Sequence, residues 1–101
     1  MEFVYFIYDS NNIKIGFTKN IKKRIKELQT SNSNKLMLLG YINGDINKEQ
    51  FLHNQFKNYQ ILNEWFKPDQ ALIDYINENN VMDVYLGWLK DKLYIYKVMR
   101  G

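Results

Sequence analysis

Four polar side chains in the first half of the chain have the chemistry needed to act on a phosphate ester. They are Tyr5, Lys14, Arg24 and Glu49. Hydrolysis of a phosphodiester needs a carboxylate for a divalent cation, a cationic group for the phosphate charge, and a group that takes a proton from water. The four residues offer a candidate for each role. No Gly-rich phosphate loop, nucleophile elbow or carboxylate cluster suggests another chemistry.

A predicted β-hairpin carries the first two of these residues. Apolar side chains on both faces predict a strand over residues 1–8, and the Asp/Asn-rich run 9–12 predicts a turn. The chain then resumes as a strand over residues 13–17. Period-two alternation places Lys14 and Gly16 on one face of this strand and the isoleucines on the other.

Arg24 belongs to a helix predicted over about residues 19–30, with Thr18 as its N-cap. The apolar stripe of this helix is formed by Ile21, Ile25 and Leu28. Arg24 lies about 60° from the centre of the stripe, at the margin of the buried face. The lysines of this helix lie on the opposite, solvated side; they are Lys22, Lys23 and Lys26.

The rest of the chain predicts one more strand and two more helices. The strand covers residues 36–42, and the next helix, about 47–57, places Glu49 and His53 beside two core positions, Leu52 and Phe56. A third helix has Pro68 in its first turn and runs to about residue 79. Its predicted buried stripe consists of Ala71, Leu72, Tyr75 and Ile76.

Composition excludes several classes of protein. A length of 101 residues allows a single domain with one core. The absence of Cys excludes disulfides, thiolate catalysis and Cys-based zinc sites, and the single His53 excludes sites built on two imidazoles. No apolar run reaches the roughly 20 residues that span a bilayer, and no signal-peptide pattern is present. We therefore expect an intracellular, cytoplasmic protein.

Charge is unevenly distributed along the chain. The formal net charge is +3, and residues 1–35 contribute seven Lys/Arg against three Asp/Glu. A basic N-terminal third suggests an anionic partner, of which nucleic acid is the commonest. Lys19, Lys22 and Lys23 are candidates for contacts with a phosphate backbone, although such a group is often only the solvated face of a helix.

Five short motifs, in order along the chain, resemble one family. They are VYFI at 4–7, IKIG at 13–16, Arg24, Glu49 with Leu52-His53, and EWF at 64–66. This order is similar to that of the GIY-YIG nuclease superfamily, and most similar to its small branch from phages and viruses. The resemblance covers about residues 3–78. The sequence departs from the superfamily pattern at Phe3, where the first triad has glycine, and in the short spacing between the two triads.

The resemblance implies an α+β (α/β) fold, with a small three-stranded antiparallel sheet flanked by helices, over residues 1–80. It also implies a nuclease that depends on Mg²⁺ or Mn²⁺ and acts most often on DNA. By position, Tyr5 orients or deprotonates the attacking water, Arg24 contacts the phosphate and Glu49 holds the metal. Lys14 replaces a tyrosine, as a phosphate contact or general base, and Gly16 keeps a glycine.

Two further residues belong to the pattern of the branch rather than to the superfamily. His53 is a candidate for proton transfer, and Glu64 for a second carboxylate near the metal or a partner of Arg24. Each site residue has a simpler interpretation. Arg24 can pair with Glu27 or Glu64 while covering the apolar stripe, and Glu49 and His53 can form a surface helix pair.

Residues 81–101 form an extension that the resemblance does not cover. Their alternation fits a hairpin, with a helix as the alternative. We expect them to pack on the same domain or to form a homodimer interface through their aromatic side chains. The main functional alternative is therefore a binding module on the same fold, with weak or no catalysis. Such a module would hold nucleic acid through the basic third or a protein through the extension.

Overall fold

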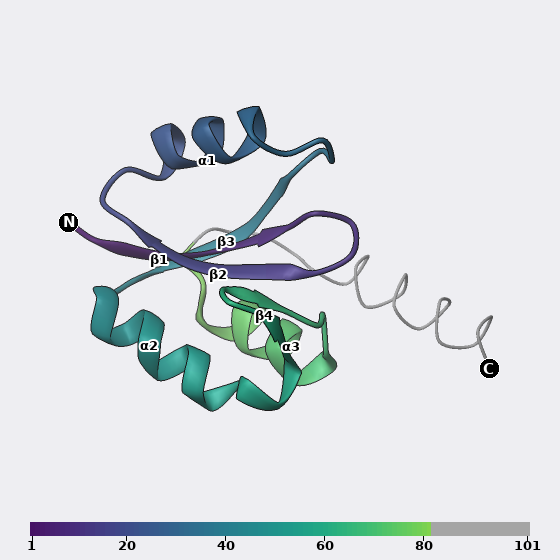
Figure 1. Cartoon of the computed structure of the whole chain (residues 1–101). Coiled ribbons are helices and arrows are strands. Elements are labelled where there is room, and N and C mark those ends of the chain that lie inside the picture. The colour runs from purple at the N-terminus through teal and green to yellow at the C-terminus, as the bar shows by residue number, and fades with distance from the viewer. Residues whose placement is uncertain (82–101) are drawn as a thin grey trace.

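A computed structural model describes residues 1–81 and shows an α+β domain built on one antiparallel sheet (Figure 1). The strand order is β3-β1-β2-β5-β4. The elements along the chain are β1 (Phe3–Tyr8), β2 (Ile13–Thr18), α1 (Ile21–Thr30), β3 (Met37–Asn43), α2 (Ile46–Gln55), a 3-10 turn (Lys57–Tyr59), β4 (Gln60–Leu62), β5 (Trp65–Phe66) and α3 (Gln70–Asn79). The predicted fold class is confirmed.

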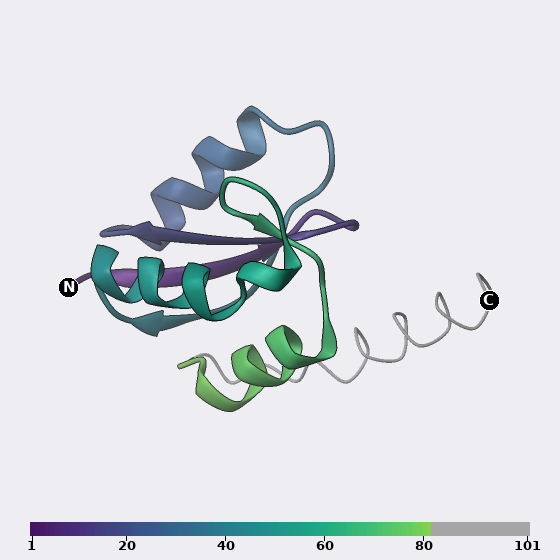
Figure 2. The same ribbon diagram turned by 60° about the horizontal axis from the view of Figure 1, so that its bottom comes forward.

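The helices divide between the two faces of the sheet, with α1 on one face and α2 and α3 on the other (Figures 1 and 2). The main core lies under α2 and α3. It is formed by alternate residues of β1 and β2, such as Phe6 and Ile15, together with apolar residues of the two helices, such as Leu52 and Ile76. Burial of these side chains is the main force that holds the layers together. Helix α1 contributes no fully buried residue.

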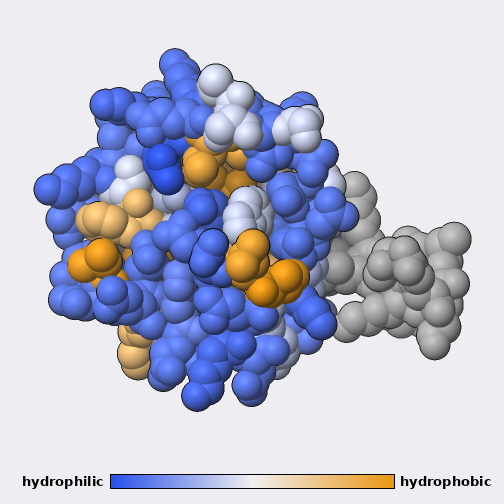
Figure 3. All heavy atoms as spheres, in the orientation of Figure 1, coloured by the Kyte–Doolittle hydropathy of each residue, from blue (hydrophilic) through white to orange (hydrophobic). Residues whose placement is uncertain are grey.

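The face assignment of β2 is confirmed. Ile13 and Ile15 belong to the core, whereas Lys14 and Gly16 face the side covered by α1. On the surface seen in Figure 3, apolar side chains form small separate groups in a mostly hydrophilic face. Within residues 1–81, no helix has the length and hydropathy needed to cross a bilayer.

The prediction of three strands was wrong in number, because the sheet has five. The two missed strands, β4 and β5, form a short hairpin beside β2. Asn63 lies in its turn with φ 52°, a left-handed conformation that Asn tolerates better than most residues. Strands of two and three residues are too short to show period-two alternation, and their position depends on pairing with β2.

Helix boundaries differ from the prediction by one or two residues, and one face assignment was wrong. Strand β2 continues through Thr18, so the cap of α1 is Asn20, whose side chain accepts from the Lys23 backbone N–H. Asp69 caps α3, and Pro68 therefore lies before the helix rather than in its first turn. Ala71 is exposed, and Ile73 takes its place in the core.

The predicted hairpin of the C-terminal extension and the homodimer formed through its aromatic residues fall on residues 82–101, which lie outside the described residues.

Candidate active site

The tyrosine of the first motif packs directly on the glycine of the second. Strands β1 and β2 pair Tyr5 with Gly16, and both face α1. A Cβ atom added to Gly16 would lie 2.3 Å from both Cζ and Oη of Tyr5. Tyr5 itself is only 1% exposed. The absence of a side chain at Gly16 is therefore what makes room for the Tyr5 ring.

Substitution Gly16→Ala is expected to destabilise the fold by about 1–3 kcal/mol, the usual cost of forcing extra atoms into a packed site. Thermal and urea unfolding measure this cost. In a Tyr5→Ala background the ring is gone, so the added methyl group should cost much less. An equal cost in both backgrounds would show that the contact with Tyr5 is not what requires glycine.

Arg24 orients the hydroxyl group of Tyr5. Its Nε donates to Tyr5 Oη at 3.4 Å, while its Nη1 pairs with Glu27 Oε2 at 3.3 Å. Burial raises the pKa of Tyr5, and the hydrogen bond and charge of Arg24 only partly oppose this. Tyr5 therefore carries its proton at neutral pH. The predicted place of Arg24, at the margin of the buried face, is confirmed, and so is the simpler interpretation that it pairs with Glu27.

Lys14 forms the closest charged contact of the site. Its Nζ lies 2.6 Å from Glu64 Oε2 and 5.4 Å from the centre of the Trp65 ring. Lys14 is only 9% exposed. Strand β5 fixes this arrangement, because Trp65 pairs with Lys14 and the Ile15 N–H donates to the Glu64 carbonyl at 2.9 Å. Glu64 is thus a partner of Lys14 rather than of Arg24.

His53 contacts a backbone carbonyl of β2 just beyond the residues that pair with β5. Its Nε2 lies 2.8 Å from the Ile15 carbonyl oxygen, and its ring packs edge-on against Phe66. A carbonyl oxygen only accepts hydrogen bonds, so Nε2 carries the proton. This nitrogen therefore cannot accept a proton from water while the contact lasts.

Glu49 lies one helical turn before His53, with its side chain 12% exposed and its Oε1 3.9 Å from His53 Nε2. Burial raises the pKa of Glu49, the charge of Glu64 raises it further, and His53 and Lys14 act in the opposite direction. The charges of both carboxylates also raise the pKa of Tyr5. Glu49 therefore lies within electrostatic reach of Glu64, Lys14 and Tyr5, and it is not a solvated surface residue.

The donors present suit a hard divalent cation that keeps most of its water. Glu49 is a partly buried carboxylate destabilised by a second carboxylate nearby, and a cation would relieve that repulsion. Within residues 1–81 there is no group of three or more His, Cys, Asp and Glu side chains able to enclose a metal. A single carboxylate of this kind is the ligand type with which Mg²⁺ keeps most of its waters, whereas a closed structural metal centre needs more protein ligands than Glu49 and Glu64 supply.

The candidate backbone-binding lysines lie outside this cluster. Lys22 and Lys23 are exposed on α1, as predicted, and Lys19 lies 3.9 Å from Glu2 with its side chain 76% exposed. Two contributors were not predicted. They are the backbone of Ile15, which binds both Glu64 and His53, and Tyr41, which pairs with Tyr5 across β1 and β3. The register that reveals them follows only from the folded sheet.

Comparison with known proteins identifies a family over most of the chain. No curated protein and no solved structure gives a significant match. The model of one family, described as the T5orf172 domain, matches residues 2–88. This range includes every strand and helix of the described structure and all the site residues above. The chain therefore belongs to the T5orf172 domain family.

Proposed function

We propose that this protein is a divalent-metal-dependent endonuclease of the GIY-YIG type that hydrolyses phosphodiester bonds, with DNA as its substrate. The observation that carries the proposal is the hydrogen bond that joins Arg24 of α1 to Tyr5 of β1, with Glu49 of α2 near enough for its charge to act on Tyr5. Two further points support it. The T5orf172 family is associated with nuclease-related domains, and the basic N-terminal third suits a polyanion.

Each residue takes a role that fits its surroundings. Glu49, with help from Glu64, would hold Mg²⁺ or Mn²⁺, which supplies Lewis-acid stabilisation of the phosphate charge when bound. Arg24 would contact the phosphate through the N–H groups not used by Tyr5 and Glu27. Tyr5, protonated at neutral pH, would orient the attacking water by a hydrogen bond rather than remove its proton.

Lys14 and His53 act mainly as positioning residues in this scheme. Lys14 positions Glu64 through their ion pair at 2.6 Å. His53 binds the Ile15 carbonyl and so positions the turn of α2 that bears Glu49. We assign proton transfer to neither in the state described. Lys14 becomes a phosphate contact only if substrate binding draws it away from Glu64.

A second function is favoured by that same ion pair. With Lys14 and Glu64 paired at 2.6 Å, the charge of Lys14 is occupied rather than offered to a phosphate, and that of Glu64 is occupied rather than offered to a metal. This is the arrangement expected of a nucleic-acid-binding module with little catalysis. The two functions give different results with a supercoiled plasmid. The endonuclease should nick it in Mg²⁺ or Mn²⁺ and stop when EDTA is added. A protein that retards DNA in a gel but never nicks it in either metal is the binding module, and the proposal of an endonuclease then fails.

A further inference from the structure

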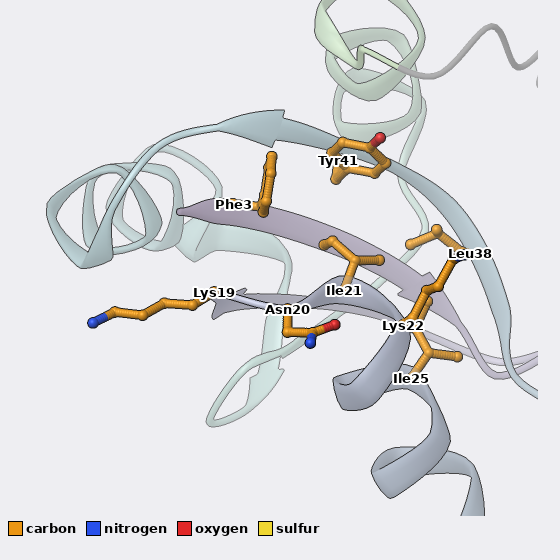
Figure 4. A pocket seen from close by; sticks show the side chains of 8 residues that line it. All are labelled: Phe3, Lys19, Asn20, Ile21, Lys22, Ile25, Leu38 and Tyr41. Atoms are coloured by element: carbon orange, nitrogen blue, oxygen red, sulfur yellow. The ribbon is translucent and has the colours of Figure 1, made fainter. Parts of the chain in front are cut away.

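A groove separate from the candidate active site lies between α1 and strands β1 and β3, on the face of the sheet that α1 covers (Figure 4). Its volume is about 460 Å³. The residues that matter for its chemistry are the aromatic Phe3 and Tyr41 on the strands, the apolar Ile21 and Ile25 on the helix, and Lys19 and Lys22. None of these residues has been given a role in catalysis above.

The walls of this groove suit a flat, apolar ring. Phe3 and Tyr41 meet edge to face with ring centroids 5.3 Å apart, and both side chains remain partly exposed. Ile21 and Ile25 are likewise only partly buried on the side of α1. The volume falls within the range of roughly 300–1,000 Å³ typical of small-molecule sites. A planar group entering here would contact aromatic and aliphatic surface and displace water from both.

The charge around the groove indicates what the flat group is attached to. Lys19 extends outward at its end, and the exposed Lys22 lines it from α1 (Figure 4). None of the residues that line the groove in the described part of the chain is acidic. An apolar floor with a cationic rim is complementary to a nucleobase joined to phosphates, because the base gains stacking contacts and the phosphates gain ion pairs.

We propose that this groove binds one unpaired nucleobase of the DNA strand, with Lys19 and Lys22 on the flanking phosphates. The inference rests on the proposed function, because it names the form of DNA that the proposed endonuclease binds beside its active site. Tyr41 pairs with Tyr5 across neighbouring strands, and Arg24 lies between Ile21 and Ile25 along α1. Paired residues on neighbouring strands have Cα atoms about 4.5–5.5 Å apart. A base in the groove therefore lies one strand away from the hydroxyl group that Arg24 orients.

Base pairing decides access to this groove. A base inside a duplex is stacked on both sides and has to leave the helix before it can enter a pocket. A single strand, an overhang or a frayed end presents its bases freely. The protein should therefore prefer DNA with unpaired bases over a blunt duplex of the same sequence.

Fluorescence anisotropy in EDTA tests this preference without cleavage. The full-length wild type should bind a short labelled single strand more tightly than the blunt duplex. Tyr41→Leu, which keeps apolar volume but removes the ring, should weaken single-strand binding about tenfold, in line with the usual contribution of one base–aromatic stack. An abasic single strand should bind the wild type more weakly as well. Phe51→Leu is the matched control, because Phe51 is 60% exposed and does not line the groove.

Two features keep the test decisive. Phe3→Leu alters the second aromatic residue of the groove, and thermal unfolding shows which variants are folded. If both folded variants bind single strands like the wild type, or if the wild type binds the blunt duplex equally well, the proposal is overturned. The result does not depend on nuclease activity. If the protein does not cleave DNA but still prefers single strands, the proposal for the groove stands and only the proposal of an endonuclease fails.

Discussion

Substitution of Glu49 by Gln should abolish metal-dependent cleavage while leaving the protein folded. Gln has nearly the same shape but lacks the charge that would bind a divalent cation. Loss of the contribution of a metal, several kcal/mol of transition-state stabilisation, corresponds to a fall in rate of about a thousandfold or more. The measurement is the rate of plasmid nicking in Mg²⁺ and in Mn²⁺, for the wild type and the variant at equal concentration.

Although Glu49→Gln should lose cleavage, it should be at least as stable as the wild type at neutral pH. Since the folded state raises the pKa of Glu49 above its ordinary value of 4.5, the folded protein binds this proton more tightly than the unfolded chain does. Stability therefore falls as pH rises from that value through the raised pKa, and remains lower above it. At neutral pH without metal, Glu49→Gln should melt at or above the temperature of the wild type. Below the ordinary pKa this advantage should disappear.

Added Mg²⁺ separates the two effects. It should raise the melting temperature of the wild type at neutral pH and leave that of Glu49→Gln unchanged, because a ligand stabilises only the state that binds it. Glu78→Gln is the matched control, since Glu78 is exposed on α3 and should leave nicking unaltered. If Glu49→Gln cleaves as fast as the wild type, Glu49 does not hold the metal.

The parts of the fold that were predictable from sequence are those with enough residues to show a period. Strands β1 and β2 run for six residues each and the helices for ten, so alternation and apolar stripes were visible. The β4–β5 hairpin was not predictable in this way. It consists of three and two residues, and its geometry comes from pairing with Ile13 and Lys14 and from the turn at Asn63. Tertiary context, rather than local preference, creates these strands.

The candidate site also has features that the sequence predicts and features that depend on the folded sheet. Helical geometry alone placed Arg24 at the margin of the buried face and Glu49 beside Leu52, and both positions agree with the structure. The contact of His53 with the Ile15 carbonyl could not be predicted, because it depends on β5 stopping before Ile15 and on α2 crossing that edge. The packing of Tyr5 on Gly16 likewise follows from the hairpin register, which the turn geometry sets.

The second large effect is expected at Arg24. Substitution Arg24→Lys keeps the positive charge but should reduce cleavage about 10²–10³-fold, the usual loss when one donor to a developing negative charge is removed. A lysine has one compact ammonium group and cannot hold Tyr5 Oη, pair with Glu27 and contact a phosphate at the same time. Arg24→Ala should lose at least as much. The measurement is the nicking rate at saturating DNA, so that binding and catalysis are separated.

The role of Arg24 is tested further by combination with Tyr5→Phe, which removes only the hydroxyl group. If Arg24 acts partly by orienting that group, Tyr5→Phe should cost much less in an Arg24→Lys background than in the wild type. Lys57→Ala controls for the loss of a positive charge, because Lys57 is exposed on the 3-10 turn that follows α2. Full additivity of the two substitutions would mean that Arg24 and Tyr5 act independently. The hydrogen bond between them would then be a packing contact rather than part of the catalytic arrangement.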